Sequence, residues 1–135
     1  MDDRQRLPRR AAVYAREAPG RRAQIRLDQR VGRLAGALSR LGAHHVATYA
    51  ECSLSRPWAR PGLCRLVAEA PWAFDLVVVD SYAQLTADRG DLRALLGQLA
   101  RVGVQVAVVE PSAGRRAARL VGNLVLADLV GEALR

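Results

Sequence analysis

The stretch FDLVVVDSYAQLTADRGDL (residues 74–92) decides the fold class. Its first part, DLVVVD (75–80), is continuous and β-branched, which is typical of a strand covered on both faces of a parallel sheet. A loop and then a helix over 87–103 are predicted to follow. Sites in α/β proteins usually lie in the loops after such strands. Residues 81–87, however, contain no acid, base or cation. This loop therefore lies where an active site is expected but lacks the side chains that usually carry out catalysis.

Working outward from this strand, the patterns predict strands and helices in strict alternation. Strands are expected over 11–16, 44–51 and 104–111, and helices over 21–42, 60–70 and 113–135. Gly42 is expected to cap the first helix and Pro71 to end the second. This order with short connections predicts an α/β fold, a three-layer sandwich with a mostly parallel central sheet of about four strands and flanking helices.

The domain organisation follows from the same reading. Residues 1–10 are expected to form a basic, flexible N-terminus, residues 11–112 one α/β domain, and residues 113–135 a long helix. That helix carries apolar residues on more than one face and is predicted to serve dimerisation. Trp58 is expected to pack over the site or serve a partner, and Trp72 to fill a gap between helix and third strand.

Charge is the strongest compositional signal in the 135 residues. The net charge is +8, all 21 basic residues are arginine, and 11 of these lie in residues 4–40 beside only Glu17 and Asp28. A polyanion such as nucleic acid is a suitable partner for this balance, although the codon usage of a GC-rich genome would also favour arginine. The arginines of the first predicted helix are interpreted either as a solvated face or as a DNA contact.

Several other classes of function are not expected. No apolar run is long enough to span a membrane, and no signal peptide is recognisable, so a cytoplasmic protein without membrane contact is predicted. Cys52 and Cys64 form no C-x-x-C unit, and His44 and His45 are expected to point to opposite faces, so no metal is expected. The G-x-G-x-x-G pattern is missing, and no cofactor is predicted.

Three motifs in order resemble the catalytic domain of serine site-specific recombinases, the resolvase and invertase family. These are YAREAP (14–19), AECSLSRPWARPGL (50–63) and VVVDSYAQLTAD (77–88), the last set against the family's D-R-L-x-R. Gly103-Val104 and Gly114-Arg115 also agree. The resemblance runs from about Ala11 to the C-terminus and implies a resolvase-like fold.

The resemblance also implies that the site is degenerate. The family's nucleophilic serine follows the first-strand arginine by two residues, and that position is Ala18. The acid and arginines of D-R-L-x-R become Ala83, Gln84 and Ala87. The vestigial site is thus expected to comprise Arg16, Ala18, Arg60, Ala83, Gln84 and Ala87. DNA or phosphate binding is expected of Arg16, Arg60, Arg115, Arg116 and Arg119.

Alternatives remain open for the individual residues. Arg16 and Arg60 either bind phosphate or form ion pairs with Glu17, Glu51 or Asp80. A displaced nucleophile could come from Ser53, Ser55 or Ser81, of which Ser81 is the best placed in the sequence, although satisfaction of loop backbone groups is the more common role of such hydroxyls.

The sequence is therefore compatible with three functions. The first is an inactive recombinase-family protein that binds DNA weakly and non-specifically, or forms a homodimer or a heterodimer with a recombinase through residues 113–135. The second is an active recombinase with a displaced nucleophile and a separate DNA-recognition subunit. The third is an α/β ligand-binding domain without a DNA role.

Overall fold

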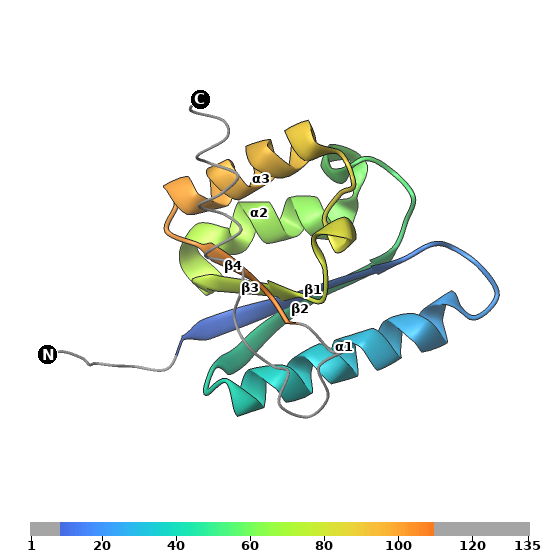
Figure 1. The fold of residues 1–135 in the computed structure, drawn as a ribbon, viewed down its shortest axis with the longest axis horizontal. Coiled ribbons are helices and arrows are strands. Elements are labelled where there is room, and N and C mark those ends of the chain that lie inside the picture. The colour runs from blue at the N-terminus through green and yellow to red at the C-terminus, as the bar shows by residue number, and fades with distance from the viewer. Residues whose placement is uncertain (1–8, 110–135) are drawn as a thin grey trace, which may run out of the picture.

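A four-stranded, all-parallel sheet with helices on both faces forms the fold (Figure 1). The structure is a computed structural model that describes residues 9–109. The strands are β1 (Arg10–Glu17), β2 (His44–Cys52), β3 (Leu76–Val79) and β4 (Gln105–Val108), in the order β2-β1-β3-β4. The helices are α1 (Ala23–Arg40), α2 (Pro61–Ala73) and α3 (Arg89–Arg101), with short 3₁₀ turns η1 (Pro57–Ala59) and η2 (Tyr82–Gln84).

The sheet separates two apolar cores. α1 covers one face, and α2 and α3 cover the other (Figure 1). On the α1 side, Leu27, Leu34 and Leu38 pack against alternate residues of β1 and β3. On the other side, α2 and α3 contribute Leu63, Leu66, Leu95, Leu96 and Leu99. The predicted three-layer α/β sandwich is confirmed.

β3 occupies the interior of the sheet, as its sequence predicts. It pairs with β1 on one side and β4 on the other, and its four residues are at most 2% exposed. Pairing with β1 extends only as far as Val13 opposite Val78. The last residues of β1 therefore continue past β3 on that side, and their backbone groups need other partners.

Glycines end α1 and α3 in the same way. Gly42 and Gly103 adopt φ values of +73° and +83°, a left-handed conformation that suits glycine. The next residues, Ala43 and Val104, donate backbone hydrogen bonds back into the last turn, at 3.1 and 2.9 Å. The prediction that Gly42 caps the first helix is confirmed.

Two predictions about α2 were wrong. The helix continues through Pro71 to Ala73, because proline has a helix-compatible φ and removes only one backbone donor. Trp72 does not fill a gap under this helix but is 77% exposed. The expected helix over 113–135, with Arg115, Arg116 and Arg119, and residues 1–8 of the expected N-terminus lie outside the described residues.

Within residues 9–109, no helix combines the length and apolar character needed to cross a lipid bilayer.

Candidate functional site

The carboxyl ends of the strands surround an open groove of about 380 Å³. Arg16 reaches it from the end of β1, Arg60 from the start of α2, and Ala87 from the connection between β3 and α3. Three residues of the predicted vestigial site thus line one groove. Ala18 is exposed two residues beyond Arg16 and is not among the residues that line this groove.

Arg16 is bound to the loop that follows β3. Its Nη2 donates to the backbone oxygen of Ala83 at 2.7 Å and its Nε to that of Gln84 at 3.1 Å. Its Nη1 donates to the backbone oxygen of Ser53 at 3.1 Å. All three guanidinium nitrogens therefore hold neutral carbonyl groups, and the side chain ties the ends of three chain segments together.

Gln84 completes this connection through its side chain. Its Oε1 accepts a hydrogen bond of 2.7 Å from the backbone N–H of Arg16. This N–H lies beyond the part of β1 that β3 pairs with. The glutamine side chain thus substitutes for a missing strand partner, which is a structural role for one of the predicted site positions.

Arg60 is the more deeply buried of the two arginines, at 3% exposed. Its Nε donates to the backbone oxygen of Ser55 at 2.7 Å, and its Nη1 to those of Gln84 and Leu85 at 3.2 and 2.5 Å. The carbonyl of Gln84 therefore accepts from both Arg16 and Arg60. Burial, and next the positive charge of Arg60, lower the pKa of Arg16.

Glu51, on β2, binds the start of α2 and the Tyr14 hydroxyl. Its Oε1 accepts from the backbone N–H of Gly62 at 2.8 Å, and its Oε2 from that of Leu63 at 3.0 Å and from the Tyr14 hydroxyl at 2.7 Å. A carboxylate at the first turn of α2 satisfies orphan donors and complements the helix dipole. A Cβ on Gly62 would lie 2.8 Å from Cδ of Glu51, so only glycine permits this approach.

Burial, and next the hydrogen bond to Glu51, raise the pKa of the Tyr14 hydroxyl. Tyr14 is 0% exposed and therefore remains protonated and donates to Glu51 throughout the physiological range. Glu51 is thus engaged by Tyr14 and α2 rather than by an arginine.

The other two acids named as possible partners belong to a separate cluster. Glu17 accepts from Arg30 at 2.7 and 3.0 Å and from Arg26 at 3.2 Å. Asp80 accepts from Arg30 through Oδ2, while its Oδ1 is buried without a hydrogen-bond partner among residues 9–109. Within the described residues, then, neither Arg16 nor Arg60 forms an ion pair with Glu17, Glu51 or Asp80.

The three serines considered as nucleophiles occupy different surroundings. Ser53 Oγ accepts a 3.0 Å bond from the backbone N–H of Ser55, the loop-satisfying role. Ser55 lines the groove together with Arg16 and Arg60, whereas Ser81 is not among the lining residues. Of these two serines, Ser55 is therefore the one that shares the groove with the site arginines.

Metal binding finds no support in the part of the chain that the structure describes. No group of three or more His, Cys, Asp or Glu side chains is placed there to hold a metal ion.

Three solved structures share this fold. The N-terminal catalytic domain of TP901-1 integrase matches with a TM-score of 0.70 and 21% identity, over 92% of this chain and 93% of that chain. The C-terminal catalytic domain of ISC1926 TnpA, an IS607-like serine recombinase, gives 0.68 and 21%, over 90% and 78%. A resolvase family site-specific recombinase from Streptococcus pneumoniae gives 0.65 and 15%, over 92% and 85%.

The chain therefore has the fold of a serine recombinase catalytic domain, and the predicted fold is confirmed. No protein-family model and no curated protein sequence matches it.

Sequence reasoning missed two features of this edge of the sheet. One is that Arg16 and Arg60 donate hydrogen bonds to backbone carbonyls. Every residue type has such a carbonyl, so the sequence does not indicate these bonds. The other is the pairing of Arg30 with Glu17 and Asp80. An arginine on the first helix with acids at the ends of two strands was a signal that could have suggested it.

Proposed function

We propose that this chain is a recombinase-family protein that does not cleave DNA and acts as a DNA-binding or dimerisation module in DNA recombination. The fold and the order of the sequence motifs support the family. The observation that carries the inactivity is the state of the groove, where guanidinium nitrogens of Arg16 and Arg60 bind backbone carbonyls. In addition, the resemblance assigns the nucleophile position to Ala18, which has only a methyl side chain.

The chemistry of strand exchange explains why this state matters. The reaction needs a nucleophile that holds the cut strand as an ester and cations that stabilise the charged transition state. Ala18 cannot supply the first, and Ala83, Gln84 and Ala87 carry no charge for the second. Arg16 and Arg60 each also use three hydrogen bonds to tie the surrounding loops together, which leaves only part of each guanidinium for a phosphate.

The module role rests on the arginines and on residues 113–135. DNA binding of this kind is weak and non-specific, because contacts between arginine and phosphate carry no sequence information. Arg115, Arg116 and Arg119 are candidate phosphate contacts, and the long predicted helix is the candidate surface for a second copy or an active recombinase. The cytoplasm, predicted from the sequence, is where such a role would operate.

The direct test is covalent trapping. The full chain is incubated with nicked and suicide duplexes and examined for a protein-DNA ester after denaturation. We expect no ester from the wild type, and none from Ala18→Ser, because one restored hydroxyl does not restore the missing cations. An ester formed by the wild type would refute the proposed inactivity. Sedimentation of the full chain, alone and with residues 113–135 removed, tests the dimerisation role.

One observation favours a second candidate, an active recombinase that uses Ser55. This serine lines the groove with both site arginines, and its backbone oxygen accepts from Arg60. In this case the trapped ester disappears on Ser55→Ala and persists on Ser81→Ala, which lies outside the set of lining residues. The same trapping assay thus separates the two candidates.

A further inference from the structure

A line of arginines follows one side of α1. Arg26, Arg33 and Arg40 are spaced by seven residues, and Arg22, the residue before the helix, precedes Arg26 by four. At about 100° per residue, all four lie within about 40° of one another around the helix axis. We call Arg22, Arg26, Arg33 and Arg40 the α1 arginine stripe.

The stripe is exposed and poorly compensated by acids. Arg22, Arg33 and Arg40 are exposed, and none of them forms an ion pair within residues 9–109. Arg26 donates to Glu17 at 3.2 Å, yet its side chain remains 49% exposed. The one acid of the helix, Asp28, accepts from Gln24 and lies at least about 120° away around the axis.

The spacing of the stripe suits a regular polyanion. Seven residues of α-helix span about 10.5 Å, close to the axial rise of about three nucleotides of one DNA strand. From Arg22 to Arg40 the stripe extends for about 27 Å. We propose that α1 binds the phosphate backbone of duplex DNA through this stripe. The proposal rests on the DNA-binding part of the proposed function and assigns that binding to a surface separate from the groove.

The composition of α1 argues against other polyanionic partners. Single-stranded nucleic acids are usually held by base stacking on aromatic side chains, and α1 contains no aromatic residue. A membrane surface needs an apolar helix face that can enter the lipid, but Leu27, Leu34 and Leu38 are at most 3% exposed in the core under the sheet. Contact with phosphates alone, as on a duplex backbone, needs neither feature.

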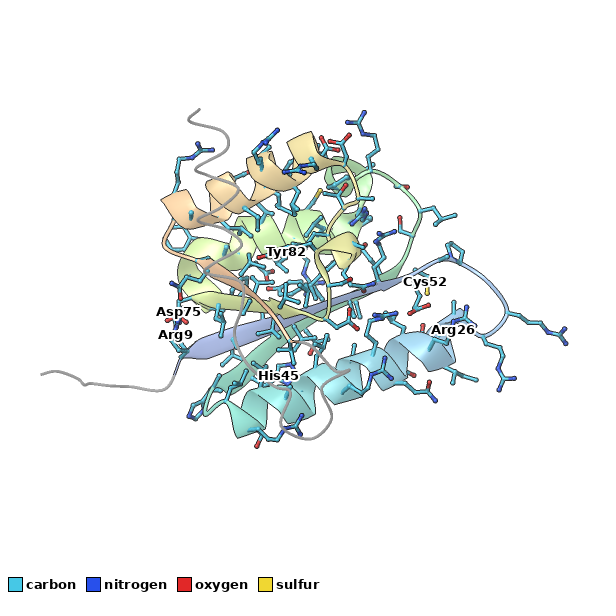
Figure 2. The ribbon with its side chains drawn as sticks, in the orientation of Figure 1. Arg9, Arg26, His45, Cys52, Asp75 and Tyr82 are labelled. Atoms are coloured by element: carbon cyan, nitrogen blue, oxygen red, sulfur yellow. The ribbon has the colours of Figure 1, made fainter. Side chains whose placement is uncertain are left out.

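The position of α1 allows the two surfaces to be tested separately. The helix starts after β1, at the sheet edge where the groove lies, and runs back along the sheet face opposite α2 and α3 (Figure 1). Arg26 lies near the loop end of the helix (Figure 2). The other stripe residues do not line the groove, so replacing them leaves Arg16 and Arg60 in place.

The experiment compares two triple variants of the full chain. Arg22→Gln/Arg33→Gln/Arg40→Gln removes three charges from the stripe, and a matched control, Arg89→Gln/Arg93→Gln/Arg101→Gln, removes three from α3 on the other sheet face. Binding to a labelled duplex is measured by fluorescence anisotropy at several salt concentrations. Thermal unfolding establishes that both variants remain folded.

The stripe variant is expected to lose affinity on the order of a hundredfold near 0.1 M salt, with a plot of log affinity against log salt shallower by about 2.7. The control variant is expected to keep the wild-type slope. Equal losses in both variants would show an effect of net charge alone and overturn the proposal, as would tighter binding to single-stranded DNA or duplex RNA.

The outcomes also separate this proposal from the proposed function. If the wild type binds duplex DNA and only replacement of Arg115, Arg116 and Arg119 weakens it, the stripe is refuted and the module role stands. A wild type without salt-dependent DNA affinity refutes both the stripe and the DNA-binding role. A trapped covalent ester refutes inactivity and leaves the stripe unaffected.

Discussion

Arginines near the carboxyl ends of the strands have two different kinds of hydrogen-bond partner. Arg30 binds the carboxylates of Glu17 and Asp80, so opposite charges compensate one another. Arg16 and Arg60 bind backbone carbonyls, which satisfy hydrogen-bond donors but carry no net charge. The first group is an electrostatic lock between α1 and two strands. The second retains its positive charge while it binds the loops that follow β2 and β3.

This difference shows that arginines lining a groove can keep their charge while they support the surrounding structure. Positive charge at Arg16 and Arg60 would suit a phosphate, and the same side chains are the structural support of the loop from Ala83 to Leu85. Removing either arginine is therefore expected to lower the free energy of unfolding. The experiments below test this view, from the largest expected effect to the smallest.

Arg60→Ala is expected to have the largest effect. The substitution leaves the carbonyls of Ser55 and Leu85 without their arginine donor and removes one of the two donors to Gln84, at a total cost of about 4 kcal/mol of unfolding free energy. Urea denaturation measures the loss. The control is Arg56→Ala, whose side chain is 78% exposed and pairs with Asp91, and which should cost less than about 1 kcal/mol. Similar losses for both would mean that Arg60 is not a structural support.

Arg30→Gln tests the electrostatic lock. Of two largely buried carboxylates, Asp80 loses the arginine that binds it and Glu17 keeps only Arg26, so we expect a loss of about 2 kcal/mol at neutral pH. The hydrogen bond from Arg30 lowers the pKa of Glu17, so the stabilisation is present above the unfolded value of about 4.3 and is lost as the pH falls through the folded value. The gap between wild type and variant should therefore narrow in acid.

Denaturation at a series of pH values checks this expectation, with Arg33→Gln as a charge-matched control three residues along α1. A gap that stays constant from neutral to acid pH would contradict the lock.

Gly62→Ala tests the close approach of Glu51 to the start of α2. The new Cβ would lie 2.8 to 3.0 Å from the carboxylate, so the carboxylate must move and its bonds to α2 weaken. A loss of about 2 kcal/mol is expected. Gly32→Ala in α1, where nothing lies within 4 Å of the new Cβ, should instead stabilise by about 0.5 to 1 kcal/mol. Thermal unfolding of the two variants gives the comparison, and equal signs would contradict it.

The tyrosines give the smallest effect. Tyr14→Phe removes one of three hydrogen bonds to Glu51 and should cost about 1 kcal/mol. Burial and a hydrogen bond to Glu69 raise the pKa of Tyr49 to about 12, and burial raises that of Tyr82. Since these folded values exceed the unfolded value of about 10, the associated stability is present below pH 10 and is lost as the pH rises further.

Ultraviolet titration of tyrosinate in the folded and urea-unfolded protein measures the tyrosine shifts. Ionisation of all three tyrosines near pH 10 in the folded protein would show that these hydroxyls are not buried in the way described.

Much of the fold could be predicted because the type of each residue indicates whether it is buried and which backbone conformation it favours. The run DLVVVD predicted the central strand, and Gly42 predicted the end of α1. Two predictions about α2 failed because the end of a helix and the packing of one side chain are not determined by the apolar pattern alone. The helix includes Pro71 and continues to Ala73, and Trp72 is exposed rather than packed under the helix.

The candidate site was predictable only in part. The resemblance identified Arg16 and Arg60 as members of one site, and the groove brings them together with Ala87. Their partners were not predictable, because any residue carries a carbonyl group. The choice between Ser55 and Ser81 also required the tertiary structure, since both follow strands in the sequence.

The sequence by itself determined the alternation of strands and helices, the central position of β3, and the methyl group at Ala18, because hydrophobic periodicity and residue identity are local properties. Only the tertiary structure decided that Arg16 and Arg60 support loops while Arg30 compensates two acids. It also decided that Arg22, Arg33 and Arg40 are exposed and form no ion pair within residues 9–109. The physical reason is that a charge finds its partner through space, among segments that the chain brings together only when it folds.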